Sequence, residues 1–280
     1  MRLFAALASF AAAWRDYPAE VGAVLGKRYL VQEWLGEGSY GLTYKCIDQR
    51  DGTLVAVKQA RPSKGNEAGK MLEREASILQ SLDHAQIPAF HHFFTERRSD
   101  YLVMSYLSGD TLEDLIFEKG RRYAEDDCIH MTLQLLDIVT YIHEKGFVHL
   151  DLRIPNVIFQ DERLYIIDFG LARRVGETLP HQPVRRGFPH KPSSSRPSKD
   201  AEEQSDLQDI GHWMLFILYS NYEPDPNANG EERSWQDELT LSDELRAMIE
   251  RLLGIQAPYS GSLEFFYELK ALAHRKGVTL

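Results

Sequence analysis

The order of five short motifs is the feature that most constrains the fold of this chain. They are a glycine-rich turn of the pattern G-x-G-x-x-G, a lysine on a strand, a glutamate on a helix, a loop of the pattern H-x-D-x-x-x-x-N and the tripeptide D-F-G. The motifs lie at residues 36–41, Lys58, Glu75, residues 149–156 and residues 168–170. Each motif alone is weak evidence, because a glycine-rich turn also occurs at dinucleotide sites and in ordinary hairpins. All five in this order are hard to obtain by chance.

The periodicity of apolar residues predicts strands early in the chain and helices later. Turn residues bound short apolar runs, which predicts strands at residues 29–35, 41–48 and 53–58. Apolar residues at intervals of three and four predict helices at residues 71–82 and 126–144, and helical structure is also expected at 111–117. One further strand is predicted at residues 164–167. An antiparallel sheet is therefore expected first and a mainly helical region after it.

Length, cysteine content and net charge limit the classes of protein to which this chain can belong. A chain of 280 residues with 43% hydrophobic content can bury a sizeable core in two lobes. Its two cysteines, Cys46 and Cys128, are far apart in sequence, which argues against a disulfide framework and favours a reducing, cytoplasmic compartment. The net charge of −10 argues against general nucleic-acid binding.

The N-terminal residues predict a short amphipathic helix. Leu3, Leu7, Phe10 and Trp14 share one helical face. The apolar stretch is too short to span a bilayer, and we interpret it as an appended helix rather than a secretory signal. Packing on the body of the protein is the favoured role, and peripheral membrane binding or partner docking are alternatives.

Together the five motifs resemble those of eukaryotic-like (Hanks-type) protein kinases, over about residues 28–275, and the size is similar to that of a compact bacterial stand-alone member. The resemblance implies a bilobal α+β fold in which an antiparallel N-lobe sheet with helix C precedes a mainly helical C-lobe. The expected parts are an N-terminal helix or extension at 1–25, the N-lobe with its glycine-rich loop at 26–107 and the C-lobe with its catalytic loop at 108–280. ATP and Mg²⁺, with Mn²⁺ as an alternative ion, are the implied cofactors.

The same resemblance assigns the nucleotide site. Glycines let backbone N–H groups approach phosphate oxygens that a Cβ would keep away, and hinge backbone groups bind the adenine edge. The residues assigned to the nucleotide are Gly36, Glu37, Gly38, Ser39, Tyr40, Gly41, Thr43, Ala56, Lys58, Met104, Tyr106, Leu107 and Ile158. Met104 would be the gatekeeper. Thr43 stands where the family usually has valine, which would weaken adenine packing.

Catalytic roles follow from matching positions. Asp151 would orient the acceptor hydroxyl and accept its proton, Lys58 would neutralise the α- and β-phosphates, and Arg153 would steady the γ-phosphate. Asn156 and Asp168 would supply oxygen ligands to Mg²⁺.

Structural roles are also carried over from the resemblance. Glu75 would pair with Lys58 as a structural switch. Glu73 is its rival two residues away, but the spacing of the following leucines favours Glu75. His149, Phe169 and Asp206 would complete the structural set, with Asp206 anchoring the start of a buried helix.

Two departures from the family pattern affect the expected regulation and specificity. Leu150 stands where most protein kinases carry an arginine that docks an activation-loop phosphate, so we expect activity that does not depend on that switch. Arg153 replaces the usual lysine of serine/threonine kinases and occurs in some tyrosine kinases. Serine or threonine remains the favoured acceptor.

The segment after the D-F-G motif lacks a clear A-P-E motif and is basic from 173 to 199. It is interpreted as a solvated extended loop, with an acidic protein substrate as the alternative and Ser193, Ser194 and Ser195 as autophosphorylation candidates. Two other functions stay open: a small-molecule kinase of the aminoglycoside or choline type, and a nucleotide-binding scaffold without catalysis.

Overall fold

A computed structural model of the chain describes residues 16–38, 40–178, 201–223 and 233–278. The predicted N-terminal helix, Ser39 and the serines at 193–195 lie outside the described residues. The chain divides into two compact units, one formed by residues through Ser108 together with Ile167–Leu171, and the other by Gly109–Ile166 together with residues from Ala172 onward. The D-F-G segment thus belongs to the sheet-bearing unit, whereas we had expected the whole chain beyond residue 107 to form the second part.

The first unit is built on a six-stranded antiparallel sheet of order β1-β2-β3-β4-β6-β5. Its strands are β1 (Val24–Leu25), β2 (Tyr29–Glu37), β3 (Gly41–Asp48), β4 (Leu54–Ala60), β5 (Phe90–Glu96) and β6 (Ser99–Ser105). Along β3, Leu42, Tyr44 and Cys46 are fully buried, as the two-residue repeat of a strand requires. The three predicted strands are confirmed to within two residues at each end.

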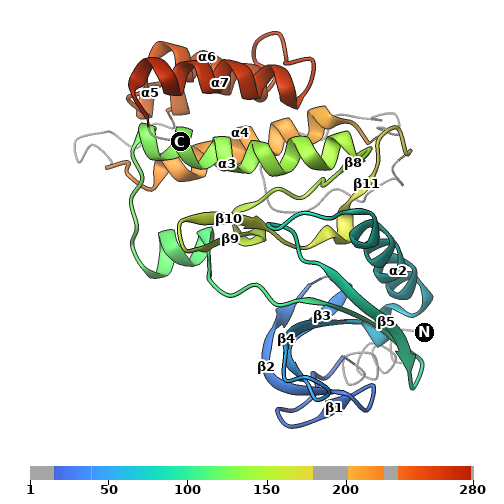
Figure 1. Cartoon of the computed structure of the whole chain (residues 1–280). Helices are drawn as coiled ribbons and strands as arrows, with labels where there is room; N and C mark the ends of the chain where they lie inside the picture. Colours follow the sequence, from blue (N-terminus) through green and yellow to red (C-terminus); the bar gives the residue numbers. More distant parts are fainter. Residues whose placement is uncertain (1–15, 39, 179–200, 224–232, 279–280) are drawn as a thin grey trace, which may run out of the picture. The chain divides into compact units, whose positions relative to one another are not determined.

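Helix α2 (Asn66–Ser81) contacts β4, β5 and β6, and Figure 1 shows it beside β5. The predicted start at residue 71 was wrong, because the helix begins five residues earlier, at Asn66. Gly69 is instead a packing residue: a Cβ there would come within 2.5 Å of the Asp100 carboxylate. The missing side chain lets the first turns of the helix approach β6.

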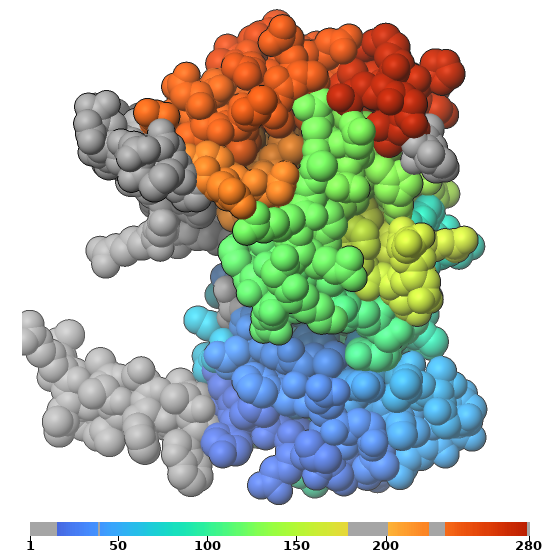
Figure 2. Space-filling view, turned by 90° about the vertical axis from the view of Figure 1, so that its left-hand side faces the viewer, coloured from blue at the N-terminus to red at the C-terminus, as the bar shows by residue number. Residues whose placement is uncertain are grey.

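The second unit is mainly helical. Its helices are α3 (Glu125–Glu144), α4 (Glu203–Tyr219), α5 (Trp235–Glu238), α6 (Asp243–Leu252) and α7 (Ser262–Lys276). Helix α3 packs against both α4 and α7, and Figure 2 shows the red surface of α7 beside the green of α3. The apolar face predicted for α3 is buried, including Ile129, Leu136 and Ile142, each with no exposed surface.

Short strands carry the loops of the second unit. Strands β7 (Asp110–Thr111), β9 (Val157–Gln160) and β10 (Arg163–Ile166) form one small sheet, and β8 (Phe147–Val148) pairs with β11 (Arg173–Arg174). Helical structure was predicted from residue 111, but Thr111 lies in β7 and the π-helical turn η2 covers Asp114–Glu118. The side chain of Asp114 accepts hydrogen bonds from the Thr111 amide at 2.9 Å and hydroxyl at 2.6 Å, a local turn that delays the helix.

Both cysteines are reduced and buried, Cys46 in the sheet and Cys128 in α3. Burial raises the pKa of each thiol to about 12. Across the described parts of the chain, we find no helix that combines the length and the apolar character needed to cross a bilayer.

Candidate active site

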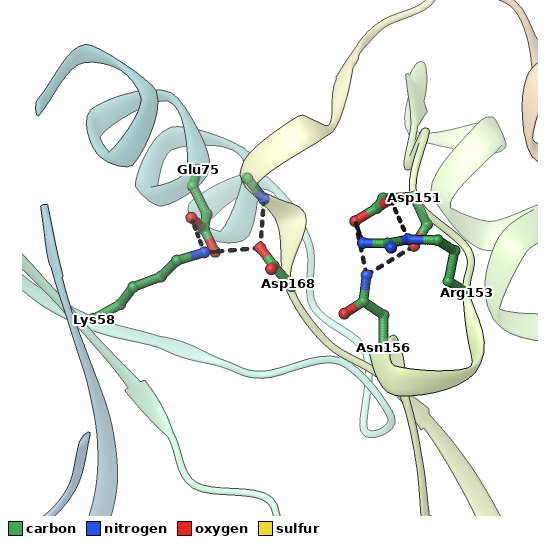
Figure 3. Close-up of polar contacts among 7 residues, drawn as sticks. Lys58, Glu75, Asp151, Arg153, Asn156 and Asp168 are labelled. Carbon is green, nitrogen blue, oxygen red and sulfur yellow. Dashed lines mark hydrogen bonds and ion pairs between the residues drawn. The ribbon is translucent and has the colours of Figure 1, made fainter. Parts of the chain in front are cut away.

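Two polar clusters hold the residues that the motifs single out, one in each unit, and Figure 3 shows the contacts within each. In the first unit, Lys58 on β4 is the centre. Its Nζ donates to Glu75 Oε1 at 2.9 Å, to Glu75 Oε2 at 2.8 Å and to Asp168 Oδ1 at 2.8 Å. Glu75 on α2 is therefore the partner of Lys58, whereas Glu73 is exposed on the same helix.

The charges of this cluster leave one negative charge in excess. Burial opposes protonation of Lys58, but the carboxylates of Glu75 and Asp168 outweigh it and raise the lysine pKa. Burial also raises the pKa of Glu75, with Asp168 adding to the effect and Lys58 opposing it. The Glu75 side chain is 2% exposed and that of Asp168 is 43% exposed. One ammonium shared by two carboxylates makes the accessible Asp168 a position that favours a further cation.

Two glycines lie so close to the side chains of this cluster that a Cβ atom would crowd them. A Cβ on Gly170 would lie 3.1 Å from Asp168 Oδ1 and 3.4 Å from both Glu75 Oε2 and Lys58 Nζ. The Gly170 amide also donates to Asp168 Oδ1 at 3.2 Å. In the glycine-rich turn, a Cβ on Gly41 would lie 3.1 Å from Lys58 Cε. Both glycines therefore make room for the charged groups rather than merely supplying a flexible turn.

The first unit also carries most of the residues predicted to bind the nucleotide. Six of the seven positions 36–41 and 43 lie on β2, on β3 or in the turn between them, and the seventh, Ser39, is outside the described residues. Gly38 N–H donates to the Gly41 carbonyl at 2.8 Å, which closes this turn. Ala56 on β4 pairs with Met104 on β6, and Tyr106 and Leu107 follow that strand. Ile158 belongs to the second unit, where it is buried on β9.

Asp151 is the centre of the cluster in the second unit. Arg153 donates to its two carboxylate oxygens at 2.7 and 2.9 Å, and Asn156 Nδ2 donates to Oδ2 at 2.9 Å and to the Asp151 carbonyl at 2.9 Å. The Asn156 carboxamide oxygen faces away from Asp151 (Figure 3). Asp151 is thus held in one orientation by charge-assisted hydrogen bonds.

Helix α4 fixes the backbone of the loop that carries Asp151. Asp206, fully buried on α4, accepts from the amides of His149 at 2.8 Å and Leu150 at 2.7 Å, and it contacts the buried His143 Nε2 at 2.9 Å. These bonds support Leu150 at a φ of 64°, a conformation that costs a branched residue free energy. Phe169, another of the predicted structural residues, is buried in the first unit.

Asp209 is a residue of this region that the motifs did not reveal. Its Oδ2 accepts the Leu152 amide at 3.1 Å, so two carboxylates of α4 hold consecutive parts of the loop. The separation of three residues between Asp206 and Asp209 places both on one helical face, which is the pattern that could have predicted this pair. Burial, together with the negative charges of Asp206 and Asp151, raises the pKa of Asp209 from 3.8 to about 7.

Replacing Asp209 should change how stability depends on pH. Because its folded-state pKa is raised, the contribution of Asp209 to stability is fully present below about pH 4 and is lost as pH rises through about 7. We expect Asp209→Asn, which keeps an oxygen acceptor for Leu152, to gain ~3 kcal/mol relative to the parent chain between about pH 5 and pH 8, on the scale of 1.4 kcal/mol per unit of pKa. Denaturant unfolding at both pH values measures this. The exposed Asp137→Asn is the control, and equal differences at both pH values would contradict the assignment.

One oxygen donor suited to a hard divalent cation lies in each unit, Asp168 in the first and Asn156 in the second. The amide oxygen of Asn156 and the carboxylate of Asp168 are the oxygen donors that Mg²⁺ prefers. Within the described residues, no three His, Cys, Asp or Glu side chains gather closely enough to bind a metal by themselves. Each of these oxygens therefore suits such an ion as a single ligand, and phosphate oxygens and water would have to complete the coordination.

Comparisons with known proteins agree with these motifs. The protein kinase domain family matches residues 29–237. The probable serine/threonine-protein kinase YbdM of Bacillus subtilis (strain 168) is 34% identical over 247 residues, which cover 87% of this chain and 89% of that protein. NUAK family SNF1-like kinase 1 of Homo sapiens is 34% identical over 151 residues, 53% of this chain but only 23% of that protein.

A solved structure shows the same fold. The crystal structure of the kinase domain of PF14_0431 superposes with a TM-score of 0.58 at 18% sequence identity, and the match covers 73% of this chain and 68% of that one. The predicted α+β class with an antiparallel sheet and a helical part is confirmed. From the family match and the likeness to YbdM, we conclude that the chain belongs to the protein kinase family.

Proposed function

We propose that the chain is an ATP- and Mg²⁺-dependent protein kinase that phosphorylates serine or threonine hydroxyls. The observation that carries the proposal is the Lys58–Glu75–Asp168 cluster, in which a protonated lysine is shared between two carboxylates. Such a lysine provides a fixed positive charge for phosphate oxygens, while Asp168 keeps an excess negative charge for a cation.

The two clusters have separate roles in the proposed reaction. Asp151 accepts the proton of the acceptor hydroxyl as the new O–P bond forms to the γ-phosphorus and the bond to the leaving ADP oxygen breaks. Arg153, bound to Asp151, adds positive charge for the transferring group. Lys58 holds the α- and β-phosphates. Asn156 and Asp168 would each offer an oxygen ligand to Mg²⁺, which would supply positive charge to the phosphates.

The relatives support a protein acceptor with a hydroxyl side chain. YbdM is named a probable serine/threonine-protein kinase, and serine/threonine-protein kinase 33 of Mus musculus is 29% identical over 239 residues. The chain spans 89% of YbdM but 48% of the latter protein, so the likeness to YbdM carries more weight for the whole chain. Arg153 in place of lysine leaves the side chain positively charged.

The test is incubation of the purified chain with Mg²⁺ and γ-labelled ATP, with and without a generic protein acceptor. Acid-stable label on serine or threonine would support the proposal, and removal of Mg²⁺ by a chelator should abolish the label. ATP binding without any label on protein would favour a small-molecule acceptor or a non-catalytic scaffold. Transfer to an aminoglycoside or to choline would separate these two alternatives.

Activity should not require phosphorylation of the segment after the D-F-G motif. Leu150 cannot bind a phosphate as an arginine does, and its amide is committed to Asp206. Replacing every serine and threonine from 178 to 198 by alanine should leave the rate of transfer to an external acceptor within about threefold of the parent chain, which is less than 1 kcal/mol of barrier. Most of these residues lie outside the described parts of the chain. A loss of more than about a hundredfold, restored by an acidic replacement, would contradict the expectation.

A further inference from the structure

Arg61, which directly follows β4, joins three segments of the first unit. Its Nε donates to Asp16 Oδ2 at 3.0 Å and its Nη1 donates to the Gly38 carbonyl at 3.0 Å. Its Nη2 also lies 3.8 Å from the Glu37 carboxylate, and its backbone amide donates to the Tyr40 carbonyl at 2.9 Å. One side chain therefore connects residues that precede the sheet to the glycine-rich turn.

The partner at the other end, Asp16, is a well-anchored buried carboxylate. It is 8% exposed and accepts from Arg61 as well as from the Ser63 amide at 2.9 Å and the Ser63 hydroxyl. Burial opposes its ionisation, but the hydrogen bonds from Ser63 and Arg61 outweigh burial and lower the Asp16 pKa. Asp16 is thus a fixed negative charge at neutral pH. Loss of its ion pair with Arg61 would leave this buried charge uncompensated.

The segment that contains Asp16 is itself held on the sheet. The Ala19 amide donates to the Tyr44 hydroxyl at 3.1 Å, and Gly22 and Ala23 exchange backbone hydrogen bonds with Val31, each at 2.9 Å. Ala19 and Ala23 also pack against the apolar core of the sheet. Asp16 therefore belongs to a segment that is held on the sheet by hydrogen bonds. Arg61 links this segment to the glycine-rich turn.

We propose that Arg61 is a positioning residue that couples the N-terminal segment, through Asp16, to the glycine-rich turn. The inference rests on the proposed function, because the turn acts there on the ATP phosphates. Holding the Gly38 carbonyl fixes the orientation of a peptide group in the turn and so reduces the ordering that nucleotide binding requires. The planar guanidinium is needed because a lysine provides one compact charge and cannot span both acceptors.

The chain contains a matched control for a merely structural role. Arg28 also pairs with a buried aspartate, Asp48, at the opposite ends of β2 and β3 from the glycine-rich turn. The side chains of Arg28 and Asp48 are 25% and 6% exposed, close to the 22% and 7% of Arg61 and Asp16. Arg28→Lys should therefore disturb the sheet as much as Arg61→Lys without reaching the turn.

The experiment compares Arg61→Lys, Asp16→Asn and Arg28→Lys in the full chain. Hydrogen exchange of residues 36–41 without nucleotide should become about tenfold faster in Arg61→Lys and in Asp16→Asn but stay unchanged in Arg28→Lys. The Kd and KM for ATP should rise about tenfold in the first two variants, which equals ~1.4 kcal/mol and is the scale of one hydrogen bond to a charged group. The kcat at saturating ATP should change less than about twofold.

The outcomes separate this inference from the proposed function. Unchanged exchange of the turn in Arg61→Lys, or equal changes in Arg61→Lys and Arg28→Lys, would overturn the positioning role. A normal turn in Asp16→Asn would overturn the coupling to the N-terminal segment. Failure of the parent chain to bind ATP would instead refute the proposed function, and the exchange measurement on the nucleotide-free protein would still decide the role of Arg61.

Discussion

The Asp151→Asn variant is expected to bind ATP with the affinity of the parent chain and to lose phosphoryl transfer by about 10²- to 10⁴-fold, the range for removal of a general base. Asparagine keeps the size of the side chain but cannot accept the hydroxyl proton. It also replaces one of the two oxygens that bind Arg153 and Asn156 by an amide donor. Transfer rates at saturating ATP, together with a direct measurement of ATP affinity, check this expectation.

A conservative change elsewhere in the same unit controls for general effects. Asp161 is exposed between β9 and β10 at a φ of 48°, a conformation that asparagine tolerates well. Asp161→Asn should therefore leave both affinity and rate unchanged. If Asp151→Asn retained transfer within tenfold of the parent rate, the assignment of Asp151 as the base would have to be abandoned.

Removing the lysine of the first cluster should lower both stability and transfer. In Lys58→Met, Glu75 and Asp168 face one another without the ammonium that both contact. Breaking a buried ion pair by removing one partner costs roughly 3–5 kcal/mol, and loss of one electrostatic contact to the reacting phosphates typically lowers the rate by about 10²- to 10³-fold. Denaturant unfolding and transfer kinetics measure the two effects separately.

A second substitution separates the structural contribution of Lys58 from its role with phosphate. Glu75→Gln removes the buried charge that Lys58→Met leaves uncompensated, so the double variant should recover part of the lost stability without recovering transfer. Lys70→Met, an exposed lysine on α2, should change neither property. Equal stability of the single and double variants would show that the Lys58–Glu75 pair is not the source of the loss.

The site residues that could be predicted from the sequence are those that belong to short motifs with a defined spacing. Lys58 follows the apolar run at 55–57, and Glu75 precedes two leucines at the spacing that resembles the kinase family, so the resemblance predicted both residues. The contact between Lys58 and Asp168 joins residues 110 positions apart, and the sequence gives no reason to group the D-F-G segment with the sheet.

The residues that were missed act through backbone groups or through distant partners. Asp209 binds an amide 57 positions away and Arg61 binds an aspartate 45 positions away. The spacing of Asp206 and Asp209 marks a shared helical face but does not identify the distant amide, and the contact of Arg61 leaves no periodic pattern. The start of α2 was missed for the opposite reason. Gly69 is a local helix-weakening residue, and its packing against Asp100 overrides that preference.

The burial of both native thiols also decides how the protein can be labelled. Thiolates rather than thiols react with alkylating reagents, and Cys46 and Cys128 have raised pKa values in the interior. These are the two cysteines of the whole sequence. A single cysteine introduced at an exposed position such as Asp137 would therefore be the one readily reactive thiol of the folded chain, and a fluorophore could be attached there without first removing the native cysteines.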